Sequence, residues 1–486
     1  MTNNLEIRSR AWLSSPPGAY LAGAVLLAAL ALVLFTNLRV DPIGRESERR
    51  AAIVARGMVE SGDWLVPRLG GTVRLQKPPL FYWAGAATAK VLGDTGPIAV
   101  RLPSAFACLA LVALIMVWAR SLGGAGQGLL AGAVLVAAIQ LTSSGRRGDA
   151  EMLLALLCVA SLMVFDRLYT THRRALLPLF GVLAGLAILT KATAVLLVVV
   201  APILAFLALE RELRRLLDPG VLSACALALA IGLSWYVAVI SLVPDAFETL
   251  WHDLILPLGQ THAARGDAAH FRPFWWYLSV LPIRAAPASL LLPVVVWRLY
   301  TTRVFRGDPR KRFAALTFLG PFVAFSLLPQ KQNHYTLSML PGLALVTADA
   351  LAALSSRVRE WLARGLGTLL ALAGIAVTVL LALFLAWIEG LPPLGVAAGA
   401  AAIGAIFALA FAAALRGWAV AFAAAWVPAF LLVFAVHRGI VSVRVAIIEQ
   451  GGYQGLTIDE RERVIHTARA HPWFVDVFRV ASGSSD

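Results

Sequence analysis

The chain has 486 residues, of which 59% are hydrophobic and 14% are charged, and its mean hydropathy is +0.78. A soluble domain keeps about a quarter of its residues charged, so this composition excludes a soluble protein and indicates an integral membrane protein. The formal net charge of +15 does not indicate nucleic-acid binding, because after the first apolar segment the basic residues lie mainly in short links between apolar segments.

Apolar segments long enough to cross a bilayer recur along the sequence and predict an all-α polytopic membrane protein. Placing the N-terminus in the cytoplasm puts most of the arginine-rich short loops on the cytoplasmic side. We therefore expect a multi-pass protein of the bacterial inner (plasma) membrane with about 13 spans. The predicted spans are residues 19–38, 100–120, 125–143, 149–166, 176–190, 192–209, 220–243, 276–297, 313–329, 334–354, 365–388, 393–415 and 418–436.

Two long segments, residues 39–99 and 244–275, are expected on the periplasmic side, because long loops cross the membrane regardless of their charge. Within the first segment we predict two interfacial helices, at 48–60 and 79–91, each with an apolar face. The sequence turns polar after the last span. We therefore assign residues 1–436 to a transmembrane bundle and residues 437–486 to a short periplasmic C-terminal tail.

Charged residues gather at the predicted outer ends of the spans. Asp149 begins an apolar helix, Lys191 interrupts the apolar run ILTKATAVLL, and Lys331 and Tyr335 lie in PQKQNHYTLSMLP. Each charge also has a structural explanation, because a carboxylate at a helix start suits the helix dipole and a lysine at a span end snorkels to the interface. An ionisable residue embedded in an apolar segment is nevertheless a functional hypothesis by default.

The two long segments place further polar residues on the same side. In the second, His270 and Arg272 precede an aromatic run typical of an interfacial belt. His270 is the candidate metal ligand, although the spacing of the loop histidines does not by itself indicate a metal. The first segment contributes Asp41, Glu46, Glu48, Arg50, Gln76, Lys77 and Tyr82. We expect one outward-facing cavity, with carboxylates to abstract a proton and cations to hold a phosphate.

Three motifs resemble those of bacterial GT-C glycosyltransferases that use lipid-linked sugars, the family of the aminoarabinose transferase and the protein O-mannosyltransferases. GDWLVPRLGG followed by QKPPLFYW is similar to their first periplasmic loop, HFRPFWWYL to their second large loop, and KQNHYTLSMLPGLALV to a later motif. The resemblance covers roughly residues 20–350. It implies a GT-C bundle with the two loop helices lying over the cavity, and transfer of a sugar from a polyprenyl phosphate to an acceptor hydroxyl.

The resemblance also implies roles for individual residues. Lys77, Lys191 and Tyr335 match family positions that face the lipid phosphate. Asp149 matches a second acidic position of the family, and His270 matches a loop histidine.

The chain departs from the family pattern at two places. The Asp-Glu pair that the family carries at the start of its first loop helix falls on Ser47 and Glu48, so the expected catalytic Asp is not in register. Glu46, Glu48 or Asp41 must stand in for it. Gln76 replaces the Glu of the family's Glu-Lys-Pro-Pro, and because an amide is a poorer metal ligand than a carboxylate, no metal is required at this site.

These observations predict an inverting glycosyltransferase that needs no cofactor. A first-loop carboxylate, Glu48 or Glu46, accepts the proton of the attacking hydroxyl, with Asp41 and Asp149 as further candidates. Fixed cations stabilise the charge of the departing phosphate. The partners are a polyprenyl-phosphate sugar donor, a glycolipid, glycan or protein acceptor, and membrane lipids. The expected phosphate-binding residues are Lys77, Lys191, Arg50, Arg272, Tyr335 and Lys331, and the expected pocket residues are Tyr82, Gln76 and His270.

Two alternatives compete with this interpretation. A transporter or flippase of lipid-linked sugars would need charges near the midplane and broken helices at paired positions, and no Gly/Pro-interrupted pair stands out in the sequence. A non-catalytic bundle of the same fold would account for the absent Asp and for Gln76.

Overall fold

The computed structural model describes residues 16–36, 38–39, 46–251, 272–301, 307–359, 361–362 and 364–365. The described part is a helical bundle with one short two-stranded antiparallel sheet, β1 (Arg68–Leu69) and β2 (Thr72–Val73). The last three predicted spans and the tail lie outside the described residues, apart from residue 365. The α-helices are α2 (Pro16–Phe35), α3 (Glu46–Ser61), α4 (Leu80–Leu92), α5 (Pro97–Gly123), α6 (Ala125–Ala137), α7 (Ile139–Gly145), α8 (Ala150–Thr171), α9 (Leu177–Val195), α10 (Ala201–Leu209), α11 (Pro219–Leu242), α12 (Ala246–Leu250), α14 (Trp276–Arg284), α15 (Leu292–Thr301), α16 (Pro309–Leu327) and α17 (Leu340–Ala353).

The predicted spans that fall within the described residues correspond to helices, and the chain is a multi-pass membrane protein. Among the described residues, 5 helical stretches are long and apolar enough to cross a bilayer, or up to 7 if each of two bent helix pairs counts as one span. The fifth and sixth predicted spans correspond to two helices that meet at a kink at Lys191, within the apolar stretch 174–209.

Two spans are sharply bent, which the sequence analysis did not anticipate. The α6–α7 pair bends by 73° and the α14–α15 pair by 117°. At the first bend, Ala138 has extended backbone (φ −71°, ψ 118°), and the Ile139 N–H donates to the Ala286 carbonyl in the linker of the second pair at 3.0 Å. A bend inside an apolar layer has to pair the backbone groups it frees, and here the two bends contact each other to do so.

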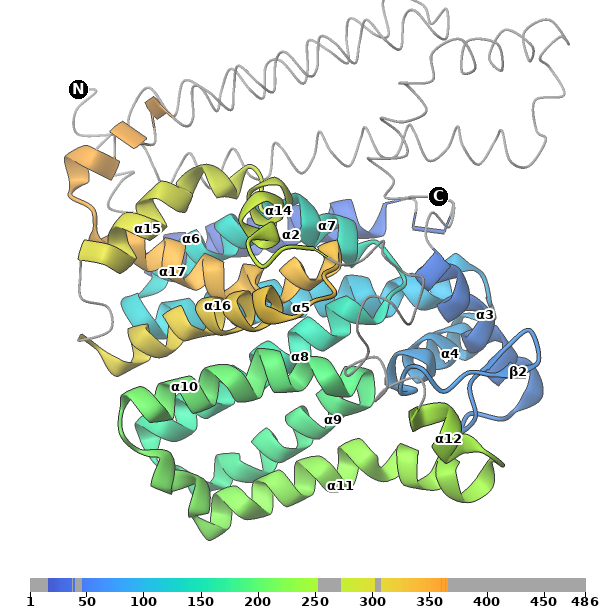
Figure 1. Ribbon diagram of the computed structural model, residues 1–486. Helices are drawn as coiled ribbons and strands as arrows, with labels where there is room; N and C mark the ends of the chain where they lie inside the picture. The colour runs from blue at the N-terminus through green and yellow to red at the C-terminus, as the bar shows by residue number, and fades with distance from the viewer. Residues whose placement is uncertain are drawn as a thin grey trace, which may run out of the picture.

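The two loop helices pack on one another at one end of the bundle. The apolar stripe of α3, with Val54 and Met58 both almost fully buried, lies against Phe81 of α4 and Val100 of α5. The opposite face of α3 carries the exposed arginines, as an amphipathic surface helix requires. Figure 1 shows α3, α4 and β2 at this end and α15 at the far end.

Small residues bring α9 and α11 into close contact. A Cβ on Gly185 would lie 2.9 Å from the Ala228 carbonyl oxygen and 2.7 Å from the Ile231 Cβ, and a Cβ on Gly181 would lie 2.7 Å from the Ala224 oxygen. This small-xxx-small spacing is a typical membrane helix contact, because it lets backbones approach where no hydrophobic effect drives helices together. It fixes the position of α9 and therefore of Lys191.

Candidate functional site

A charged cluster lies at the end of the bundle that carries α3 and α4. The Lys191 Nζ lies 2.8 Å from the Glu151 Oε1 and 4.9 Å from the centre of the Tyr335 ring. The His334 Nε2 lies 3.4 Å from the same Glu151 oxygen. We refer to these residues, together with Lys77 and Asp149, as the charged cluster. It joins α8, α9, the segment before α17 and the link before α4.

Lys191 occupies a break in its helix. Its backbone is extended (φ −166°, ψ 91°) inside α9, and a π-helical turn (Leu196–Val200) follows within the same helical stretch. Breaks and π turns in apolar helices cost regular hydrogen bonds and are frequent at functional sites. The break sets the lysine where its ammonium group meets Glu151 from α8.

Lys77 reaches the cluster because the link before α4 is held onto the bundle. The Trp235 indole on α11 donates to the Leu65 carbonyl at 2.8 Å. Leu75 is 1% exposed and packs in the same hydrophobic cluster as Leu189 and Trp235. Burial lowers the pKa of the Lys77 ammonium, and the nearby Glu151 carboxylate partly opposes this effect. A partly desolvated cation that faces a second lysine suits an anionic ligand.

Asp149 caps α8 next to the cluster. Its carboxylate accepts from the Glu151 N–H at 3.3 Å, which is the N-cap role, and its Oδ2 lies 3.9 Å from the Arg147 Nε. Asp149 also contributes to the electrostatic field at both Lys77 and Lys191. Asp149 is therefore held at the start of α8 within electrostatic reach of both lysines.

Glu48 belongs to a buried network instead of lining an open site. Its side chain and that of Arg101 are each 2% exposed, and the Arg101 Nε donates to the Glu48 Oε1 at 2.6 Å. The same oxygen accepts from the Gly148 N–H at 3.0 Å, and Arg101 also donates to the Leu38 carbonyl. Glu48 therefore links α3 and α5 to the residue that precedes Asp149.

Further polar residues of the first long segment lie on α3 and α4. Glu46 is exposed and pairs with Arg50 at 2.8 Å and with Arg49, and the hydrogen bond from Arg50 holds its pKa below the ordinary value. Tyr82 is 4% exposed; burial raises the pKa of its phenol, and the adjacent Arg74 guanidinium opposes this shift. Arg50 also lies within electrostatic reach of Tyr82.

The later motif contributes both cluster residues and supporting contacts. Tyr335 stacks on Phe325 with ring centres 4.9 Å apart. Lys331 is 3% exposed, and its ammonium donates to the carbonyls of Leu328 and Arg272, the latter at 3.1 Å. Burial lowers the pKa of Lys331. Lys331 thus ties the end of the second long segment, at Arg272, to the start of this motif.

Three further sequence-predicted residues are Gln76, Asp41 and His270. Gln76 is exposed beside Lys77. Asp41 and His270 lie outside the described residues, so their roles stay predictions. Within the described part of the chain, no three His, Cys, Asp or Glu side chains converge in a way that would hold a metal ion.

Two cluster members were not selected from the sequence, Glu151 and His334. Glu151 follows Asp149 by two residues, and His334 immediately precedes Tyr335. Both had a local signal, since each adjoins a selected residue. Glu151 belongs to the cluster because it pairs with Lys191, which lies 40 residues away in the sequence.

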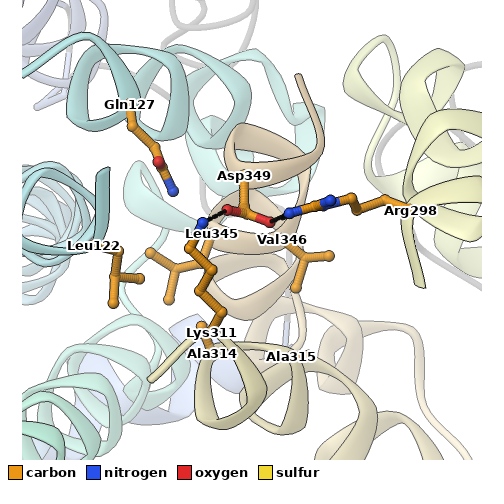
Figure 2. Close-up of a pocket in the computed structure, with 9 residues that line it drawn as sticks. All are labelled: Leu122, Gln127, Arg298, Lys311, Ala314, Ala315, Leu345, Val346 and Asp349. Carbon is orange, nitrogen blue, oxygen red and sulfur yellow. Dashed lines mark hydrogen bonds and ion pairs between the residues drawn. The ribbon is translucent and has the colours of Figure 1, made fainter. Parts of the chain in front are cut away.

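A polar pocket lies at the far end of the bundle, away from the charged cluster. Asp349 on α17 pairs there with Arg298 of α15 at 3.0 Å and with Lys311 of α16 at 2.8 Å. Figure 2 shows these three side chains meeting, with Gln127 of α6 directed toward them and apolar residues around them. The arrangement joins three helices by one carboxylate, and it is separate from the charged cluster.

The comparisons with known proteins agree with the motifs. Residues 76–237 match the family model described as dolichyl-phosphate-mannose-protein mannosyltransferase. The undecaprenyl phosphate-alpha-4-amino-4-deoxy-L-arabinose arabinosyl transferase of Yersinia enterocolitica is 28% identical over 67% of this chain and 59% of its own length. The protein of the same name from Pseudomonas paraeruginosa is 31% identical over 73% of this chain and 65% of its own length. The chain thus spans about three fifths of these relatives.

A solved structure is similar to most of this chain. The crystal structure of ArnT from Cupriavidus metallidurans bound to undecaprenyl phosphate matches with a TM-score of 0.67 and 20% identity, covering 87% of this chain and 77% of that one. At this identity the likeness establishes a shared fold. The family resemblance predicted from the motifs is therefore confirmed: the chain has the fold of ArnT and, over most of its length, the sequence pattern of the polyprenyl-phosphate aminoarabinose transferases.

Proposed function

We propose that the chain is an inverting glycosyltransferase that moves a monosaccharide from an undecaprenyl-type phosphate to an acceptor hydroxyl at the periplasmic face of the inner membrane. The observation that carries the proposal is the ion pair of Lys191 with Glu151 at a helix break in an apolar bundle, with Lys77 and Asp149 within electrostatic reach of it. The names of the relatives, which specify an undecaprenyl phosphate-linked sugar, supply the donor class.

The phosphate is held by the cations of the site. Lys77 and Lys191 face it, Tyr335 lies against Lys191, and Arg272 and Arg50 lie on adjoining segments. A phosphate is a good leaving group, so the reaction needs no general acid. The fixed ammonium groups stabilise the negative charge that grows on the phosphate as the anomeric C–O bond breaks.

We assign the base to Asp149. It lies within electrostatic reach of both lysines, whereas Glu48 pairs at 2.6 Å with the buried Arg101 and Glu46 is exposed and bound by two arginines. In-line attack by the hydroxyl, with its proton passing to Asp149, inverts the anomeric carbon. Asp41, outside the described residues, is the alternative base and enters the same experiment.

The test is sugar transfer by the purified full-length protein in detergent. The donor is undecaprenyl phosphate-linked 4-amino-4-deoxy-L-arabinose, the sugar named for the relatives, and the acceptors are a bacterial glycolipid, a glycan and a protein fraction. We expect transfer to one acceptor with inversion, and its loss in Lys77→Ala and Lys191→Ala. A protein that binds the donor and transfers to none of these acceptors would refute the enzyme assignment.

The same assay separates transfer from transport. The described part contains two bent helix pairs and the break at Lys191, features that transporters of lipid-linked sugars also use. Transfer in detergent, where there is no second compartment, would exclude pure transport. Movement of labelled donor across a vesicle bilayer without any transfer would favour it.

A further inference from the structure

The pairing of Lys191 with Glu151 has a consequence for the donor. Lys191 is one of two lysines expected to hold the lipid phosphate, yet its ammonium lies 2.8 Å from a carboxylate whose side chain is 11% exposed. A phosphate that reaches Lys191 therefore meets a negative charge within a few ångströms. In a partly desolvated site, the repulsion between the phosphate and the Glu151 carboxylate is large. It exceeds the entropy that is saved because Glu151 already holds the Lys191 side chain in place.

We propose that Glu151 competes with the lipid phosphate for Lys191. Glu151 pairs with Lys191 before the donor binds, releases it when the phosphate binds, and pairs with it again after transfer, which promotes release of the product. This inference rests on the proposed function. Glu151 is a positioning residue here, because it acts through Lys191 and does not touch the reacting atoms.

The charge of the ligand changes in the direction that this role requires. The donor is a phosphodiester with one negative charge. Transfer breaks the anomeric C–O bond, the electron pair stays on the phosphate oxygen, and the hydroxyl proton goes to the base. The product is a phosphomonoester with a charge near −2 at neutral pH. Glu151 thus repels the product more strongly than it repels the donor.

His334 can serve as a partner for Glu151 after Lys191 moves to the phosphate. The His334 Nε2 lies 3.4 Å from the same Oε1, and His334 comes from a different element than Lys191 does. The carboxylate can therefore keep a hydrogen-bonding partner while the lysine turns to the phosphate. This exchange avoids leaving a buried carboxylate unpaired, which would be costly.

The first experiment measures binding of undecaprenyl phosphate to the full chain in nanodiscs. We expect Glu151→Gln to bind it about tenfold more tightly than wild type, equivalent to about 1.4 kcal/mol. Glu151→Asp, which keeps the charge, should bind within about twofold of wild type. Glu60→Gln removes an exposed acid from α3 outside the cluster and serves as the matched control with unchanged affinity. Equal or weaker binding by a folded Glu151→Gln variant would overturn the proposal.

Steady-state kinetics supply a readout that loss of structure would not produce. In Glu151→Gln we expect the KM for the donor and the kcat both to fall, with stronger inhibition by undecaprenyl phosphate, because product release becomes slower. His334→Gln should weaken lipid binding a few-fold in the wild-type background and have no effect when combined with Glu151→Gln. An unchanged His334→Gln effect in the double variant would contradict the exchange of partners.

One measurement needs no variant. We compare wild-type affinity for undecaprenyl phosphate with that for its methyl phosphodiester, which carries a single charge. Two lysines alone would favour the monoester, whereas a competing carboxylate should make the two affinities equal or favour the diester. A tenfold preference for the monoester would overturn the proposal. Failure of the wild-type protein both to bind lipid and to transfer sugar would instead refute the proposed function.

Discussion

Neutralising Glu48 tests whether this residue is the catalytic base or a buried support. In Glu48→Gln the amide oxygen can still accept from the Gly148 N–H, but the Arg101 guanidinium, 2% exposed, loses the carboxylate that lies 2.6 Å from its Nε. Breaking a buried ion pair on one side typically costs about 3–5 kcal/mol. The pair is short, at 2.6 Å, and fully enclosed, so we expect a loss within that range.

The double variant Glu48→Gln/Arg101→Gln distinguishes the two roles. Removing both members of the ion pair leaves no buried guanidinium next to a neutral side chain at position 48, so the double variant should recover most of the stability that the single variant loses. A supporting Glu48 then predicts recovery of transfer activity in the double variant along with stability. The assays are SDS-titration unfolding of the purified protein and sugar transfer on the same samples.

One outcome would refute this reasoning. If Glu48→Gln unfolds like wild type but is inactive, and the double variant is equally inactive, Glu48 takes part in the chemistry and the assignment of the base to Asp149 is wrong. Arg101→Gln alone serves as the control, since it leaves the Glu48 carboxylate buried and should be as unstable as the first single variant.

Three further predictions address other parts of the molecule. Burial lowers the pKa of Lys77, so this lysine loses its proton, and with it the charge that binds the phosphate, as the pH rises toward the ordinary lysine pKa. We therefore expect kcat/KM for the donor to fall with rising pH, beginning below the ordinary lysine pKa, and Lys77→Arg to move this fall to higher pH. Superimposable pH profiles of the two proteins would contradict this. Asp149→Asn should lower kcat by about 10²–10⁴-fold while donor binding persists in a lipid-binding assay. Gly185→Ala should destabilise the protein by about 1–3 kcal/mol, since its Cβ would overlap α11, whereas Gly57→Ala, with open space around it, should not; equal unfolding curves would refute the contact.

The helices of the bundle were predictable because the bilayer imposes a strict rule on span length and apolarity. The bends were not. Ala138 is the residue type with the highest helix propensity, and nothing local marks it as a break. Its conformation depends on a tertiary contact, the hydrogen bond between Ile139 and Ala286, which no local pattern reveals.

The site was predictable where single residues are unusual in their surroundings. Lys191 in an apolar run and Asp149 at a helix start were selected for that reason, and the structure brings both together with Lys77 and Tyr335. Glu151 is a different case, since its significance comes entirely from the distant lysine that it pairs with. Local sequence reasoning finds charges in unexpected places more readily than it finds their partners.

The turn between α7 and α8 explains how motifs far apart in the sequence form one site. Arg146 donates from this turn to the Val33 and Leu34 carbonyls of α2. Gly148 is bound by Glu48 of α3, the Asp149 carbonyl accepts from Ser104 of α5, and Glu151 meets Lys191 of α9. Four helices thus converge on six residues, 146–151. The position of Asp149 relative to the two lysines is therefore set by the packing of α3 and α5 as much as by the site itself, which is why a substitution at Glu48 is expected to change catalysis without contact with the substrate.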